Sequence, residues 1–269
     1  MMDTEKDILI SRLEDAIKKS ERGEVAFTAF LSPADLYSAK EYLRRSGRDG
    51  LFFAFGGYSG AERARIFCIP DYMYGACDGE SLITPCQFEE LSEAVSDSVT
   101  VLEIRGSGYR ELTHKDYLGS ILALGLERDA VGDVALTDKF GALVVTSRKI
   151  ADFLKSELER VASDVVKSRV LSPKDVPDVK REIKEISDTV ASARLDCIVS
   201  ALTGMSRESA QTAIKSGLVQ VDYRISEAPD RQVGAPAVLV VRGYGKYILR
   251  EFAGETKKGR LRLLAGKYM

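Results

Sequence analysis

The chain has 269 residues, of which 45% are hydrophobic and 30% charged, so it can bury more than one core and is not a disordered tail. Its net charge of −2 is unevenly distributed: residues 1–179 hold 23 basic and 31 acidic side chains, and residues 180–269 hold 16 and 10. An acidic body with a basic C-terminal third favours a polyanionic partner contacted at one end of the chain.

Cysteine spacing argues against a metal site. None of the four cysteines stands in a C-x-x-C pair, and the chain has a single histidine, His114. We therefore expect reduced thiols in a cytoplasmic protein, with no metal and no cofactor. The cysteines are Cys68, Cys77, Cys86 and Cys197.

The N-terminal segment reads as an amphipathic helix. Leu9, Leu13 and Ile17 recur at helical spacing among charged residues, and the segment lacks the apolar core of a signal peptide. No apolar run in the chain is long enough to span a bilayer, so we expect no membrane partner.

A small mixed α/β domain is predicted over residues 1–96. After the first helix comes a strand at residues 25–31, and Ser32 with Pro33 begins a helix that runs to Gly47. Two further apolar strands are expected at residues 51–55 and 65–69.

A glycine-rich loop joins these two strands. Closely spaced glycines can point backbone amides at an anion, and two arginines add positive charge. The alternative is a tight connection that needs glycines for its geometry. The residues of this possible second anion site are Gly56, Gly57, Gly60, Arg63 and Arg65.

The central segment, residues 97–171, has a regular pattern that predicts a ferredoxin-like βαββαβ domain. Its strands lack the aromatic residues on which RNA-recognition domains stack bases, so an RNA contact here would use shape or phosphates, and a structural role is equally compatible. The expected strands are residues 99–105, 133–136, 142–146 and 164–171, and the helices are residues 113–125 and 148–161.

A proline-containing linker at residues 172–178 precedes the last domain, residues 183–269. The pattern there predicts a strand at 183–193, then two short helices that end at Gly204 and Gly217, with Ser206 capping the second. Strands follow at 218–221, at 237–241 and from Lys246. Alternation in the tail, residues 254–268, predicts an edge strand with one cationic face.

Basic side chains recur through this last domain. Several separated phosphates could be bound from one face by such a helix pair and glycine turn, although an ordinary solvated surface also carries basic residues. The candidate contacts are Arg194, Arg207, Lys215, Arg242, Lys246, Lys257, Lys258, Arg260 and Arg262.

Three motifs of this domain resemble the RNA-binding module named after small-subunit ribosomal protein S-four. They are R-L-D at residues 194–196, S-R-x-x-A-x-x-x-I-x-x-G-x-V-x-V at 206–221, and V-R-G-x-G-K at 241–246. The resemblance implies two helices followed by a small sheet, with the helical face binding structured RNA. Where the module usually reads V-N-G, this chain has Val221, Asp222 and Tyr223, so we expect a different turn.

Other motifs are similar to those of the YlmH family of bacterial proteins. They are F-F-x-F-G-G-Y-x-G-A-E-R-x-R at residues 52–65, I-P-D-Y at 69–72, HKDYLGSILALGLERDAVGD at 114–133 and TKKGRLR at 256–262. The resemblance implies the partners of this family: the large ribosomal subunit, through ribosomal RNA or tRNA held on it. It also implies a role in the rescue of stalled nascent chains, and some members are associated with cell division.

An enzyme is the alternative, because such modules are often attached to methyltransferases and pseudouridine synthases. The G-x-G of residues 106–108 lacks the third glycine of a nucleotide loop, and His114 opens a helix, where a capping or surface role is more common. Pseudouridine formation requires a catalytic aspartate, and the R-L-D run that contains Asp196 is similar to the run around that aspartate. A carboxylate in the first turn of a helix is, however, also favoured by the helix dipole. We therefore expect no catalytic residues.

Overall fold

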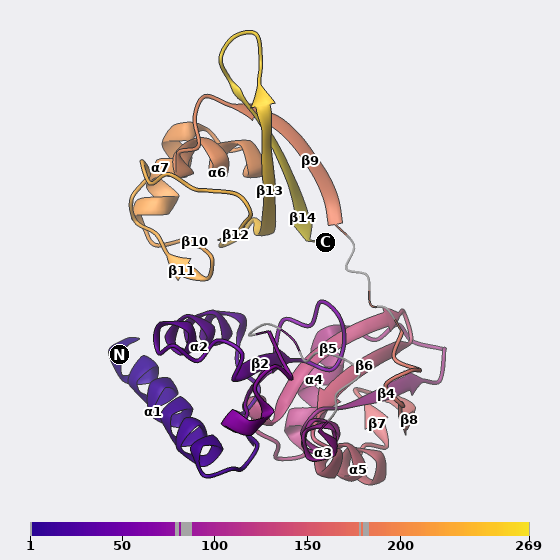
Figure 1. The fold of residues 1–269 in the computed structure, drawn as a ribbon. Helices are drawn as coiled ribbons and strands as arrows, with labels where there is room; N and C mark the ends of the chain where they lie inside the picture. The colour runs from indigo at the N-terminus through magenta and orange to yellow at the C-terminus, as the bar shows by residue number, and fades with distance from the viewer. Residues whose placement is uncertain (1, 79–80, 82–87, 178, 180–182, 269) are drawn as a thin grey trace. The chain divides into compact units, whose positions relative to one another are not determined.

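The computed structural model describes residues 2–78, 81, 88–177, 179 and 183–268, and Figure 1 shows its fold. The chain forms two compact units, Met1–Val179 and Lys180–Met269. Both combine helices with antiparallel sheets, as expected for the α+β class. The predicted boundary at residue 96 lies inside the first unit.

Two helices and a three-stranded sheet begin the first unit. Helix α1 (Met2–Glu21) buries Leu13 completely, and α2 (Pro33–Arg45) starts as predicted, with the side chain of Ser32 accepting a hydrogen bond from the amide of Asp35. The sheet order is β1 (Ala26–Phe27), β3 (Arg65–Cys68) and β2 (Phe52–Phe55). The predicted first strand is shortened because the Phe30 amide donates to the carbonyl of Asp129 rather than to β3.

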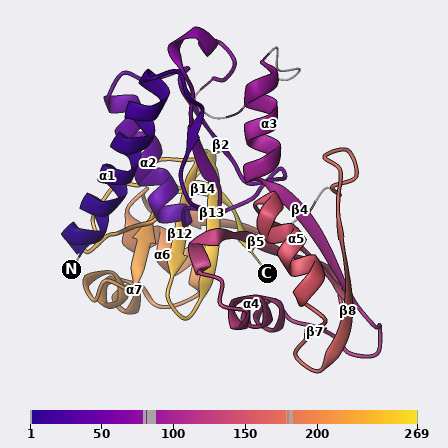
Figure 2. The same ribbon diagram turned by 90° about the horizontal axis from the view of Figure 1, so that it is seen from below.

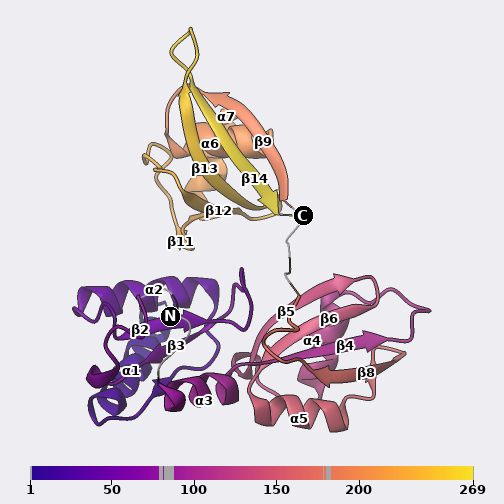
Figure 3. The same ribbon diagram turned by 45° about the vertical axis from the view of Figure 1, so that its right-hand side comes forward.

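The rest of the first unit follows the predicted βαββαβ order. Strand β4 (Thr100–Gly106) leads to α4 (His114–Ala123), β5 (Val131–Asp138), β6 (Gly141–Thr146), α5 (Arg148–Glu157) and β8 (Asp164–Val170). The strands lie in the order β5-β6-β4-β8-β7, and Figure 3 shows the first four side by side. Helix α5 ends earlier than predicted because β7 (Arg160–Val161) forms a hairpin with β8.

The sequence patterns did not indicate α3 (Glu89–Ser98), which packs against α5 (Figure 2). Two short 3-10 helices, η1 (Asp71–Met73) and η2 (Arg128–Ala130), complete the unit.

One apolar cluster joins the two predicted halves of the first unit. Phe30, Phe53 and Phe67 from the first half pack with Val101 and Val145 from the second, and all five are buried. Burying these rings together removes apolar surface of both halves from water, so the halves share a core and form one unit.

The second unit places α6 (Leu195–Thr203) and α7 (Arg207–Lys215) on a six-stranded sheet (Figure 1). The predicted helix ends are confirmed: Gly204 has a left-handed φ of 75°, and the Ser206 side chain caps α7. The strand order is β11 (Arg224–Ile225), β10 (Val219–Val221), β12 (Ala237–Val241), β13 (Gly245–Glu255), β14 (Leu261–Tyr268) and β9 (Ile183–Val190).

The prediction of an edge strand in the C-terminal tail is wrong. Strand β14 lies between β13 and β9 and pairs with β9 along its whole length, from Leu261 opposite Val190 to Tyr268 opposite Ile183. The predicted strand before α6 therefore returns to form the edge. Its partner lies far along the chain, and no local pattern records that pairing.

The two-residue turn of residues 222–223 joins β10 to β11, and the expectation that it differs from the turn of the usual module stays a prediction. Asp222 and Tyr223 have φ of 49° and 62°, and these left-handed values are those of the type I′ turn that favours tight hairpins. Among the residues described, no helix has the length and apolar character needed to cross a membrane. Cys68, Cys77 and Cys197 are buried free thiols, and Cys86 lies outside the described residues.

Candidate nucleic-acid interface

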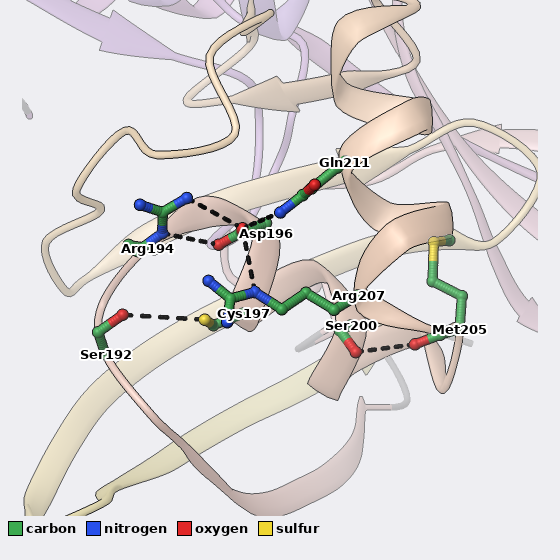
Figure 4. Close-up of polar contacts among 8 residues, drawn as sticks. All are labelled: Ser192, Arg194, Asp196, Cys197, Ser200, Met205, Arg207 and Gln211. Atoms are coloured by element: carbon green, nitrogen blue, oxygen red, sulfur yellow. Dashed lines mark hydrogen bonds and ion pairs between the residues drawn. The ribbon is translucent and has the colours of Figure 1, made fainter.

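A buried carboxylate organises the start of both helices in the second unit (Figure 4). Asp196 lies in the first turn of α6 with none of its side chain exposed. Arg194 donates from Nε and Nη2 to its two oxygens, each at 3.1 Å, and Arg207 donates from Nε at 3.1 Å. Gln211, one turn further along α7, donates from Nε2 at 2.7 Å. Of these four charge-assisted hydrogen bonds, the two from Arg207 and Gln211 fix α6 against α7.

The same contacts keep Asp196 ionised. Burial raises the pKa of its carboxyl, but the hydrogen bonds from Arg194, Gln211 and Arg207 outweigh burial and hold the pKa well below its usual range. The side chains of Arg194 and Arg207 nevertheless remain 33% and 52% exposed. The carboxylate therefore orients two guanidinium groups that still reach solvent, whereas its own burial leaves it no access to a substrate.

A third arginine is fixed at the edge of the sheet. Arg260 follows the turn between β13 and β14, and its Nε donates to the Thr189 hydroxyl at 3.1 Å, while Nη2 donates to the Thr189 carbonyl. Lys257 and Lys258 lie exposed in the same turn. The hairpin therefore carries three predicted contact residues together.

Lys246 has different surroundings. Its Nζ donates to the Tyr223 hydroxyl at 3.0 Å and lies 5.0 Å and 5.1 Å from the ring centres of Tyr223 and Tyr268, as in cation–π contacts. The left-handed backbone of Tyr223 belongs to the turn that brings its ring to the lysine.

The predicted basic residues do not all share one face. Lys246 and Arg262 precede Tyr247 and Leu263, which are buried against the helices, so strand alternation puts the two cations on the opposite side of the sheet. Arg242 is exposed in the turn between β12 and β13, and Lys215 is exposed at the end of α7. The expectation of a single cationic face is thus wrong.

The glycine loop of the first unit binds an internal anion. The amides of Glu62 and Arg63 donate to the Asp133 carboxylate at 2.7 Å and 3.0 Å, and the Tyr58 hydroxyl donates to it at 2.9 Å. In this Asp133 clasp the amides at the end of the loop already have an acceptor from the protein itself. Because Asp133 lies in β5, these hydrogen bonds hold the loop against that strand, and the loop stabilises the first unit.

The arginines beside the loop also face inward. Arg63 donates to the carbonyls of Phe30, Arg128 and Val131. Arg65 is only 8% exposed, its guanidinium lies over the Phe30 ring at 4.3 Å, and burial lowers its pKa to about 10. A side chain built on Gly57 would come within 2.9 Å of Val145, so this glycine permits close packing. Gly56 is similarly crowded by Ala61, whereas Gly60 is open.

The G-x-G segment after β4 is also engaged. The amide of Ser107 donates to Asp164 at 2.9 Å, and the Ser107 hydroxyl donates to the same carboxylate at 2.5 Å. His114 begins α4 inside the capping box formed by Thr113 and Asp116, and burial is the largest cause that lowers its pKa. These contacts explain both motifs as parts of turns and helix starts.

Sequence reasoning missed the acceptors and rings that position the cations. Gln211 follows Arg207 at the i, i+4 spacing of one helix face, and this signal could have indicated a shared partner. Asp133, Thr189 and Tyr268 gave no such signal, since their partners are distant in the chain.

Three comparisons show which known proteins the chain is similar to. The family described as "Putative RNA-binding domain in YlmH" matches residues 97–173. The "Ribosome-associated protein quality control protein P2" of Bacillus subtilis (strain 168) is 31% identical over 217 residues, which cover 80% of this chain and 76% of that protein. The structure titled "Cell division protein ylmH from Streptococcus pneumoniae" is 18% identical with a TM-score of 0.48, over 65% of this chain and 95% of that one. On the similarity to the Bacillus subtilis protein and the family match, the chain belongs to the YlmH family.

Proposed function

We propose that the protein is a non-catalytic RNA-binding protein of the large ribosomal subunit, where it contacts ribosomal RNA or tRNA and acts on stalled nascent chains in the cytoplasm. The observation that carries the proposal is the buried Asp196, which holds Arg194 and Arg207 in fixed positions while both guanidinium groups stay partly exposed. Guanidinium groups oriented in advance bind phosphates with little further ordering.

The charge distribution supports an RNA partner for the second unit. Residues 242–269 hold eight basic and two acidic side chains, so a polyanion is attracted to this part of the chain. A ribosome-associated relative and an RNA-binding family domain in the first unit support a partner of the same class.

Binding to purified large ribosomal subunits, with and without bound tRNA, tests the proposal. We expect log Kd to change linearly with log salt, by about 0.7 to 0.9 for each phosphate contact. Arg207→Ala combined with Lys215→Ala should weaken binding and flatten this slope.

The matched control is Lys18→Ala combined with Arg45→Ala, which removes two exposed helical cations from the acidic first unit. This control should bind as the wild type does. Equal binding and equal slopes for both double variants would refute the role of the second unit, provided that circular dichroism shows both proteins folded.

A further inference from the structure

A hollow of about 380 Å³ lies beside the turn between α6 and α7. One side is formed by the end of β9, the other by α6 and the start of α7, and Arg260 closes it from the β13–β14 turn. Its lining includes Asp188, Val190, Cys197, Ala201, Met205 and Arg207. A volume of this size falls in the range, about 300 to 1,000 Å³, of small-ligand sites.

Two guanidinium groups reach the hollow from distant parts of the chain. Arg207 is oriented by Asp196, and Arg260 is oriented by Thr189. Because each arginine already has a partner that fixes its direction, a phosphate between them would be bound without reordering two long side chains. Figure 4 shows Arg207 near the turn that Ser200 and Met205 close with a hydrogen bond of 2.8 Å.

The remaining wall suits a nucleobase better than a second phosphate. Val190 and Cys197 are buried and expose little surface, but Ala201 and Met205 are half-buried, so their exposed parts give this side a small apolar surface. Asp188 also lines the hollow, and its carboxylate accepts hydrogen bonds while repelling phosphate. The Asp188 carboxylate can therefore accept hydrogen bonds from donor groups on the edge of a base.

We propose that this hollow receives one unstacked nucleotide of the bound RNA. Arg207 and Arg260 hold its phosphates, and the base lies on the wall of Ala201 and Met205 beside Asp188. The inference rests on the proposed RNA-binding function and specifies which feature of the RNA the second unit recognises. Single-stranded loops and bulges present such splayed nucleotides, whereas a continuous duplex does not.

Fluorescence anisotropy of the full chain with two labelled RNA duplexes tests the inference. One duplex carries a single-nucleotide bulge, and the other has the same sequence fully paired. We expect several-fold tighter binding of the bulged RNA. Arg260→Ala should abolish this preference and reduce the salt slope by about 0.7 to 0.9, the contribution of one phosphate.

Ala201→Phe distinguishes the contribution of the base from that of the phosphates, because the larger side chain fills the hollow without changing its charge. This variant should lose the preference for the bulge and keep the salt slope. Arg250→Ala is the matched control, because Arg250 is an exposed arginine of β13 that pairs with Glu185 and does not line the hollow.

A second measurement does not depend on how Ala201→Phe folds. The chain contains no tryptophan, so Met205→Trp places a single tryptophan in the wall. Bulged RNA should quench its fluorescence saturably, and paired RNA should not.

Two negative results are distinguishable. Equal binding of both duplexes, with no selective quenching, would overturn the nucleotide site while leaving RNA binding intact. If the wild-type chain bound neither RNA nor large ribosomal subunits, the proposed function would fail as well.

Discussion

Arg207 Nε lies 3.1 Å from Asp196 Oδ2, which links the first turn of α7 to the first turn of α6. The residue best placed to bind a phosphate is therefore also part of the hydrogen-bond network that holds the two helices together. Its replacement changes both RNA affinity and local packing, and each effect needs its own measurement.

Asp196→Asn should lower the free energy of unfolding of the second unit at pH 7 by about 2 to 4 kcal/mol, because two arginines lose their buried counterion. The pKa of Asp196 is lower in the folded than in the unfolded chain, so its contribution is fully present above the unfolded value of about 3.9 and is lost as pH falls through the folded value.

Urea unfolding at pH 7 and at pH 3 measures this difference. The difference in free energy of unfolding between the wild type and Asp196→Asn should be smaller at pH 3 than at pH 7. Glu227→Gln, a change at an exposed carboxylate, is the control and should show no gap at either pH. A difference between the wild type and Asp196→Asn that increases at pH 3 would contradict the lowered pKa of Asp196 in the folded chain.

Asp133→Ala should destabilise the first unit by about 2 to 4 kcal/mol, because the amides of Glu62 and Arg63 and the Tyr58 hydroxyl lose their acceptor. Thermal unfolding followed by circular dichroism measures the loss. Asp97→Ala removes an exposed carboxylate that pairs with Arg148 and should cost under about 1 kcal/mol. Similar losses for the two variants would show that the clasp contributes little.

Gly57→Ala and Gly60→Ala form a matched pair. Both glycines have left-handed φ, 87° and 83°, so alanine costs about 1 to 2 kcal/mol at either position. Only at Gly57 would the new methyl group meet a neighbour, Val145 at 2.9 Å. Denaturant unfolding should therefore show a larger loss of free energy of unfolding for Gly57→Ala. Equal losses for the two variants would mean that Val145 shifts to accommodate the new methyl group.

Lys246→Ala should weaken binding to large ribosomal subunits less than Arg207→Ala does. Lys246 lies on the sheet side away from the helices and already contacts Tyr223 and Tyr268. The same salt titration compares the two variants once thermal unfolding has shown that both are folded. A larger loss of affinity for Lys246→Ala would indicate that RNA contacts the side of the sheet away from the helices.

Local patterns identified much of the fold correctly. Ser32 and Ser206 cap helices at the predicted positions, because a capping side chain bonds to an amide only two or three residues away. Runs of apolar residues likewise predicted most strands. These signals depend on neighbours in the chain, so a single sequence contains them.

The sequence alone thus determined the helix starts, the basic character of the last domain and the motifs of its family. Tertiary structure decided which of these residues meet. The Arg63 side chain faces inward because backbone carbonyls of distant segments accept its hydrogen bonds, and β14 lies inside the sheet because β9 returns to pair with it. Arg260 joins Arg207 at one hollow. Each of these contacts joins segments far apart in the chain. Their formation depends on burial and pairing of the whole unit, which neither residue type nor spacing encodes locally.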